Sequence, residues 1–164
     1  YGEIRGYPQR SLIRLRKYWY QVEKRDPPPI VFTYLSRGRP RFIFNEARAI
    51  PLNTFHCIYP FKIRDSRSLK ALLAYLNSNL VAKMLRLIGR SYGGATLKLE
   101  PRDLDKLPVL HPALIDENEL ASLFDELSKS SDSEHEIKQQ IDAIILTILN
   151  RVKTLSLLDY LSSR

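Results

Sequence analysis

Short apolar runs separated by turn residues fill the first third of the chain. Ile30–Leu35 (IVFTYL) and Arg41–Asn45 (RFIFN) are rich in β-branched and aromatic residues, and a basic turn over 36–40 separates them. Such runs favour strands, and a short turn containing Gly and Pro between two runs favours a hairpin. Lys17–Glu23 (KYWYQVE) and Thr54–Phe61 (TFHCIYPF) show the same strand preference. The pattern therefore predicts a β-region in the N-terminal third.

After residue 65 the apolar spacing becomes helical. Apolar residues recur every three or four positions over Leu69–Leu76 and again over Leu80–Ile88. Ser66 is the predicted N-cap, and Asn77–Asn79 is predicted to interrupt the stripe. We expect helical structure over 67–89 with a break near its middle.

Two capping-box patterns introduce further helices beyond residue 112. Asp116 precedes Glu119 by three positions, and Ser133 precedes Glu136 by the same spacing. An apolar face follows each pair, and the wider of the two runs from Ile137 to Val152. A separate short helix is expected over 154–161.

Strands first and helices last predict an α+β fold. We expect a small mixed β-sheet region over about 17–61 with a further strand at 96–99, helices over 67–89, and a C-terminal helical segment over 117–162. Fully antiparallel pairing is the alternative. Residues 1–112 would form one unit, and residues 113–164 would be a helical segment that packs on it or on a further domain.

One compact stretch, Gly89–Pro108 (GRSYGGATLKLEPRDLDKLP), changes backbone type three times. Gly93-Gly94 predicts a turn or a close backbone approach, because a Gly pair reaches positive φ at least cost. Thr96–Leu99 alternates as a strand does, Pro101 suits the first turn of a short helix, and Pro108 ends it. We interpret this stretch as an element that positions its neighbours.

Charge divides the 164 residues unevenly, although the formal net charge is +8. Residues 1–64 hold thirteen Lys/Arg and four Asp/Glu (+9), residues 65–112 eight and four (+4), and residues 113–164 five and ten (−5). A basic body with an acidic final third predicts a polyanionic partner, most commonly nucleic acid. A basic surface that serves only solubility is the alternative.

Several classes of protein are excluded by what the sequence lacks. No apolar run is long enough to cross a membrane, and the start has no apolar segment of the kind found in signal peptides. The chain begins at Tyr1 and its single methionine is Met84, so we expect a piece of a longer protein. A lone Cys57 fits a reducing cytoplasm.

Catalytic and metal-binding signatures are missing as well. There is no Gly-rich phosphate loop, and His56, His111 and His135 lack ligand spacing. Asp26-Pro27-Pro28 resembles the start of the Asp-Pro-Pro-aromatic motif of amino-methyltransferases, but Pro29 offers no ring to stack on a base, so a polyproline linker is the better interpretation. We therefore predict no metal site and no catalytic residue in this chain.

Two clusters of basic and aromatic residues on turns are the best candidates for a binding site. The first is the 37–45 hairpin, where an Arg fork suits phosphate or guanine and Asn suits adenine edges. The second surrounds the Gly pair, whose backbone can approach a phosphate closely. The candidate DNA-binding residues are Arg37, Arg39, Arg41, Asn45, Arg90, Tyr92, Gly93, Gly94 and Lys98.

Several short motifs follow one another along the chain in a distinctive order. They are Trp19-Tyr20, Pro28-Pro29-Ile30, Asn45, Leu52-Asn53-Thr54-Phe55, Leu72 to Ser78, Gly89, Tyr92-Gly93-Gly94, Leu97, Leu104 and Leu107-Pro108-Val109. This order resembles the C-terminal part of adenine-specific (N6) DNA methyltransferases, with the gamma-class enzymes of prokaryotic restriction–modification systems nearest. The similarity covers about 17–112, with a weaker echo at Ile141-Asp142. Ala95 departs from it, since relatives often have a third glycine there.

The resemblance implies a target-recognition domain that contacts double-stranded DNA while a covalently preceding methyltransferase domain binds S-adenosylmethionine and the extruded base. The chain would then hold no cofactor and would not be catalytic by itself. The Leu-Asn-Ser helix and the Leu-Pro-Val element are also similar to those of type I restriction specificity subunits. Two alternatives therefore stay open: a stand-alone specificity subunit that recruits a separate enzyme, and an RNA-binding or helical adaptor module.

Overall fold

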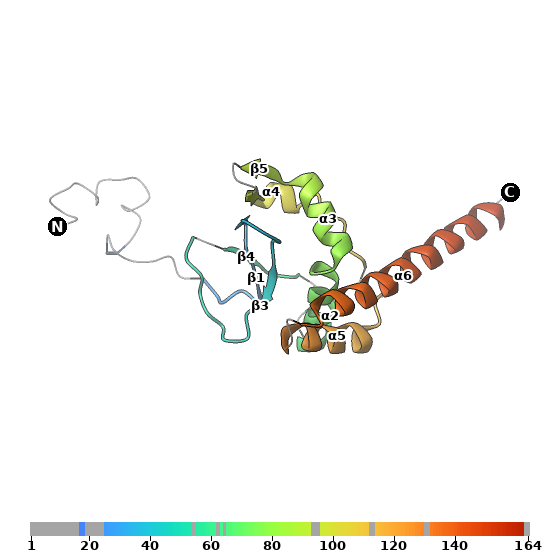
Figure 1. Cartoon of the computed structure of the whole chain (residues 1–164), viewed down its shortest axis with the longest axis horizontal. Coiled ribbons are helices and arrows are strands. Elements are labelled where there is room, and N and C mark those ends of the chain that lie inside the picture. The colour runs from blue at the N-terminus through green and yellow to red at the C-terminus, as the bar shows by residue number, and fades with distance from the viewer. Residues whose placement is uncertain are drawn as a thin grey trace.

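The computed structural model describes residues 17–18, 25–53, 55–61, 63, 65–92, 96–111, 114–129 and 132–162, with the backbone alone at 92 and 155–162. The predicted strand over 17–23 falls almost entirely outside these ranges, as do Gly93 and Gly94. Within them, short strands come first, two helices follow, and two further strands precede the remaining helices, so the predicted α+β class is confirmed (Figure 1). The strands form two separate sheets.

Sheet A has the order β3-β1-β4, built from β1 (Ile30–Phe32), β3 (Phe42–Phe44) and β4 (His56–Ile58). β1 is antiparallel to both neighbours, with Phe32 opposite Phe42 and His56. Ile30 and Phe32 are fully buried, because alternate residues of a strand face the same side. The predicted hairpin between the IVFTYL and RFIFN runs is confirmed.

Sheet B has the order β2-β6-β5, built from β2 (Leu35–Ser36), β5 (Arg90–Tyr92) and β6 (Thr96–Lys98). Both of its pairings are antiparallel, like those of sheet A, so the predicted mixed sheet is wrong and the antiparallel alternative is confirmed. β5 has no apolar alternation that would predict a strand. It forms because β6, the following strand, supplies its hydrogen-bonding partners.

Two helices, α2 (Ser66–Leu76) and α3 (Asn79–Ile88), replace one helical stripe, and the predicted break is confirmed. Asp65 is the N-cap of α2, whereas the sequence predicted Ser66. The Asp65 carboxylate accepts from the backbone N–H of Ser68 at 2.8 Å and from the Ser68 hydroxyl at 2.6 Å. These two hydrogen bonds lower the pKa of Asp65. Ser78 caps α3 through the backbone N–H of Val81.

The C-terminal helices are α4 (Pro101–Leu104), α5 (Glu117–Lys129) and α6 (Glu134–Ser162). α5 begins after Asp116, as predicted, because that carboxylate accepts from the backbone N–H groups of Asn118 and Glu119. The separate helix expected over 154–161 is wrong: α6 continues unbroken, since its sequence contains no Gly or Pro that would end it.

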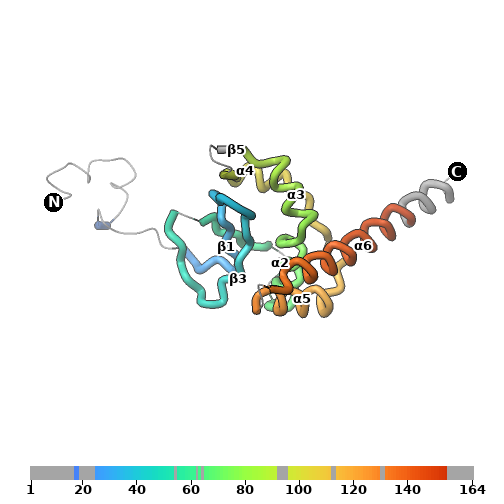
Figure 2. Tube along the Cα trace, viewed as in Figure 1, coloured from blue at the N-terminus to red at the C-terminus, as the bar shows by residue number. Residues whose placement is uncertain are grey.

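One hydrophobic core joins these elements. It includes Phe32 of β1, Leu73 of α2, Leu120 of α5 and Ile141 of α6, all of them fully buried. α5 packs along α2, and the first half of α6 packs on α2, α3 and α5 (Figure 2). In Figure 1 the second half of α6 extends away from the other helices.

Candidate nucleic-acid interface

Sheet B brings the two basic clusters together. Lys98 of β6 lies opposite Leu35 of β2 on one side and opposite Arg90 of β5 on the other. Residues directly opposite in antiparallel strands share a face, with Cβ atoms roughly 4.5–5.5 Å apart. β2 then leads straight into the turn that carries Arg37, Arg39 and Arg41. Residues more than fifty positions apart in the sequence therefore belong to one continuous strand-and-turn surface.

The turn over 37–41, called the basic turn below, is held at its base while its arginine side chains are exposed. Thr33 bonds Arg41 in both directions: its backbone N–H donates to the Arg41 carbonyl at 3.1 Å, and its hydroxyl accepts from the Arg41 backbone N–H at 2.8 Å. The Ser36 hydroxyl accepts from the Gly38 backbone N–H at 3.2 Å. The backbone is thus fixed by bonds that do not use the guanidinium groups.

Arg39 is linked to α6 through Asn79, the first residue of α3. The Arg39 guanidinium donates to Asn79 Oδ1 at 3.3 Å, and Asn79 Nδ2 donates to Asp142 Oδ2 at 3.1 Å. The other Asp142 oxygen accepts from the backbone N–H of Leu80 at 3.1 Å, which adds a second cap to α3. Asp142 therefore fixes the amide that faces Arg39.

Arg41 faces the first turn of α6. Its guanidinium lies 3.9 Å from Glu134 Oε2, and Glu134 Oε1 accepts from Lys138 Nζ at 2.6 Å. The hydrogen bond from Lys138 lowers the pKa of Glu134, and the charges of Lys138, Arg41 and Arg39 add to that effect. A polar hollow of about 600 Å³ between the basic turn and α6 is lined by Asp132, Glu134 and His135 on the helix side. The acidic first turn of α6 therefore lies beside the basic turn.

Asn45 uses its side chain within the protein. Its Nδ2 donates to the carbonyls of Pro28 at 2.7 Å and Ala49 at 2.8 Å, and its Oδ1 accepts from the Ala49 backbone N–H at 3.0 Å. These bonds order the turn after β3, which includes Arg48 at φ 51°. Contact between this amide and an adenine edge would require at least one of them to break.

Around the Gly pair the structure describes Arg90 and Lys98 with their side chains. Arg90 is exposed. Lys98 Nζ lies 2.7 Å from Glu100 Oε1, and this bond, together with the Lys98 charge, lowers the pKa of Glu100. Gly93 and Gly94 lie outside the described residues, and for Tyr92 only the backbone is described, as the last residue of β5.

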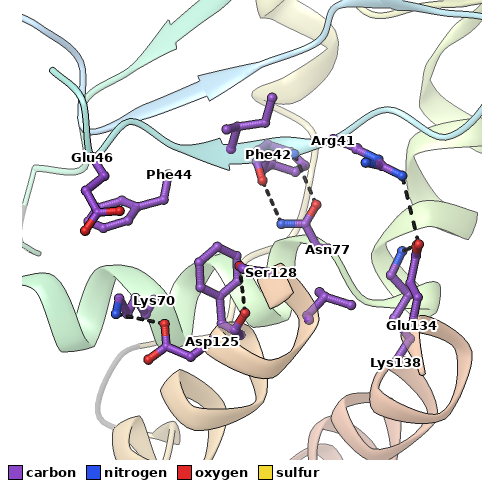
Figure 3. Close-up of a pocket in the computed structure, with 13 residues that line it drawn as sticks. Arg41, Phe42, Phe44, Glu46, Lys70, Asn77, Asp125, Ser128, Glu134 and Lys138 are labelled. Carbon is purple, nitrogen blue, oxygen red and sulfur yellow. Dashed lines mark hydrogen bonds and ion pairs between the residues drawn. The ribbon is translucent and has the colours of Figure 1, made fainter. Parts of the chain in front are cut away.

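Asn77–Asn79 are predicted from the sequence only to interrupt the helical stripe, but in the structure their side chains also bond to other elements. Asn77 Oδ1 accepts from the backbone N–H of Phe42 at 3.1 Å, and its Nδ2 donates to the Phe42 carbonyl at 2.8 Å (Figure 3). An amide so placed acts as a strand partner for β3. The available signal was three consecutive polar side chains at the junction of two apolar helical stripes.

A pocket of about 430 Å³ lies beside this junction, between β3 and the helices α2, α5 and α6 (Figure 3). Except for Glu46, its charged residues form ion pairs: Lys70 Nζ lies 2.8 Å from Asp125 Oδ1, and Glu134 contacts both Lys138 and Arg41. The Lys70–Asp125 pair joins α2 to α5, and the Arg41–Glu134 pair joins the basic turn to α6. The candidate interface is therefore the basic turn with the Arg90–Lys98 pair.

A surface of exposed cations carried by a small sheet and supported by helices is typical of nucleic-acid-binding modules. The C-terminal domain of the Type II methyltransferase M.Eco57I defines a family whose pattern matches residues 1–146. The chain belongs to this family of methyltransferase C-terminal domains.

Two curated relatives agree with this assignment. Type II methyltransferase M.AccI of Acinetobacter calcoaceticus is 32% identical over 151 residues, which are 88% of this chain and 28% of M.AccI. Type II methyltransferase M.XamI of Xanthomonas campestris pv. amaranthicola is 28% identical over 109 residues, which are 66% of this chain and 20% of M.XamI. The chain thus spans about a quarter of the length of these relatives. None of the described helices is long and apolar enough to cross a membrane.

Proposed function

We propose that this chain is the DNA target-recognition part of an adenine-specific methyltransferase of a cytoplasmic restriction–modification system. The observation that carries the proposal is the pairing in sheet B, which aligns Arg90 and Lys98 with the strand that enters the basic turn. The family assignment supports a methyltransferase context, and the exposed cations supply the charge that binding to a polyanion requires.

The roles of the candidate residues differ. Arg37, Arg41, Arg90 and Lys98 contact phosphates of the DNA. Tyr92 and the backbone of Gly93 and Gly94 are further candidates for contact with the DNA backbone. Arg39 contacts a base edge, because its guanidinium is already oriented by Asn79. Asn45 is the second candidate for base contact. In the state described here it instead orders the turn that follows β3.

The methyl donor, S-adenosylmethionine, is assigned to the preceding methyltransferase part. The groove beside β4 presents Asp105 as the single carboxylate among its described lining residues, and its His56 and Arg25 donate to Leu99 O and Cys57 Sγ. These groups do not suit a ligand that carries an ammonium group and ribose hydroxyls. The preceding part would hold the donor and transfer the methyl group to N6 of the extruded adenine.

The salt dependence of DNA binding tests the electrostatic part of this proposal. The logarithm of the affinity should fall linearly with the logarithm of salt concentration, by about 0.9 per phosphate contacted. Arg37→Ala and Arg90→Ala should each reduce that slope by about 0.9, whereas Arg151→Ala on the far part of α6 should leave it unchanged. A flat salt response of the unmodified chain, or tighter binding of single-stranded RNA than of duplex DNA, would contradict the proposal.

The base-reading part needs a separate measurement. Arg39→Ala should relax discrimination at one base pair by about 1–3 kcal/mol, and Arg39→Lys should not restore it, because lysine lacks the bidentate fork. A uniform loss of affinity across all sequences would make Arg39 a phosphate contact. The adenine assignment is tested by nucleoside mass spectrometry of DNA modified by the complete polypeptide, and methylated cytosine would contradict it.

A further inference from the structure

An apolar groove of about 1040 Å³ opens between β4 and the segment that follows α4. Its floor includes Leu72 and Leu76 of α2, which are buried. Its rim consists of large apolar side chains that are exposed: Tyr59, Phe61 and Val109, with Phe61 at 86% and Val109 at 56% exposure. Exposed apolar side chains gathered around a groove mark a surface that another molecule covers.

The chemistry of the groove restricts what can cover it. Among the residues that the structure describes, Arg25 and Asp105 are the charged ones that line it, and one cation facing one anion does not make the basic surface that a nucleic acid requires. Its polar groups are directed to the chain itself: His56 Nε2 donates to the Leu99 carbonyl at 2.9 Å, and the Tyr59 hydroxyl donates to the Asp26 carbonyl at 2.7 Å. A small-molecule site normally presents polar groups that converge on its ligand. The groove therefore suits an apolar protein surface.

We propose that this groove docks the methyltransferase domain that precedes the chain in the same polypeptide. The chain matches a C-terminal domain and covers only 28% and 20% of its two relatives, so most of each relative lies outside the matched region. The described part of the chain passes this groove at its N-terminal side, because Arg25 lines it and Asp26 is bonded to Tyr59. A domain in the same polypeptide is held near this surface by its linker, and such an effective concentration, on the order of millimolar for a short linker, favours it over a second copy.

Cysteine labelling tests the docking with two well-matched positions. Phe61 in the groove is 86% exposed and Leu87 on α3 is 85% exposed, and Leu87 does not line the groove. Phe61→Cys, Val109→Cys and Leu87→Cys would each be made in the 164-residue chain and in the complete polypeptide. Maleimide labelling rates at each site would then be measured by peptide mass spectrometry without DNA.

The groove positions should react about tenfold more slowly in the complete polypeptide, the retardation expected when nine molecules in ten are docked, while Leu87→Cys reacts equally in both. Equal rates at both groove positions would overturn the inference. So would protection that rises with the concentration of the isolated chain, because a second copy would then be the occupant. The inference rests on the proposed attachment to a methyltransferase domain but not on DNA recognition, so failure of the salt experiment above would leave this result unaffected.

Discussion

The link from Asp142 through Asn79 to Arg39 makes a prediction about a residue that is not itself proposed to touch DNA. Asp142→Asn keeps the shape of the side chain and one oxygen for the Leu80 backbone N–H, but it places an N–H₂ group where Asp142 Oδ2 now accepts from Asn79. The Asn79 amide then has to turn over to regain a partner. After that rotation it presents N–H₂ to the Arg39 guanidinium, which is also a donor.

The expected costs follow from these contacts. Loss of the negative charge that Asp142 of α6 presents to the N-terminus of α3 removes about 0.3–1 kcal/mol, and one weakened hydrogen bond removes about 0.5–1.5 kcal/mol, so the free energy of unfolding should fall by roughly 1–2.5 kcal/mol. Arg39 keeps its charge but loses its orientation. Discrimination between base pairs should therefore fall by on the order of 1 kcal/mol, about fivefold, while the salt slope is preserved.

Two measurements separate these effects. Urea unfolding reports stability, and competition between a duplex selected from a random pool and duplexes changed at single base pairs reports discrimination. Asp125→Asn is the matched control, since it removes the same charge from a carboxylate that lies 2.8 Å from Lys70 and makes no contact with the basic turn. In an Arg39→Ala background, Asp142→Asn should cause no further loss of discrimination.

Unchanged discrimination in Asp142→Asn, at protein concentrations where the variant is folded, would refute the positioning role. Loss of discrimination that persists in the Arg39→Ala background would refute it too, because Asp142 would then act through another group.

Three further predictions concern stability. Gly89→Ala should lower the free energy of unfolding by about 1–3 kcal/mol, because a Cβ there would lie 2.7 Å from a Leu97 methyl and 2.9 Å from the Leu85 carbonyl oxygen. Gly38→Ala is the control and should be neutral, because a Cβ there would have nothing within 4 Å. Equal urea midpoints for the two variants would contradict this prediction. Asn77→Ala should cost about 2–4 kcal/mol by the same assay, since it leaves the N–H and C=O of Phe42 without their partner, and a loss below about 0.5 kcal/mol would count against that role. The pKa of Glu134 is lowered in the folded state, so the stabilisation from its carboxylate is fully present above the unfolded-state pKa of 4.5 and is lost as the pH falls through the folded-state pKa. Glu134→Gln should therefore flatten the dependence of the free energy of unfolding on pH in that acidic range. An unchanged pH dependence would argue against the ion pairs.

Local patterns were sufficient for several of the elements. The β1–β3 hairpin follows from two β-prone runs around a Gly-Pro turn, and the break between α2 and α3 follows from polar residues between apolar stripes. The short helix after Pro101 also forms where the proline predicts it. Each of these features depends on residues within about ten positions of one another, where spacing and propensity carry the information.

Features that depend on distant residues could not be predicted in this way. Leu35 and Ser36 leave the first sheet because β6, more than sixty residues later, offers them a pairing edge. The Asn77–Phe42 bonds span 35 positions and the Asn79–Asp142 bond spans 63. Side-chain amides in such positions do not alter hydrophobic periodicity, so the pattern contains no trace of them. The two basic clusters were predicted from the residues at the turns, but only the tertiary structure shows that sheet B places them on one surface.

Base recognition needs side chains held to within about 0.5 Å, yet the arginines of the basic turn are exposed and cannot be fixed by packing. Their order has to come from the backbone and from neighbouring polar groups. Asn77, Ser78 and Asn79 supply much of it from three consecutive positions: Asn77 holds β3 where it leaves the turn, Ser78 caps α3, and Asn79 contacts Arg39. Because Ser78 is fully buried, the two amides on either side of it share one rigid anchor. The junction between two helices therefore acts together with the hydrogen bonds of Thr33 and Ser36 at the base of the turn to determine where the basic turn presents its charges.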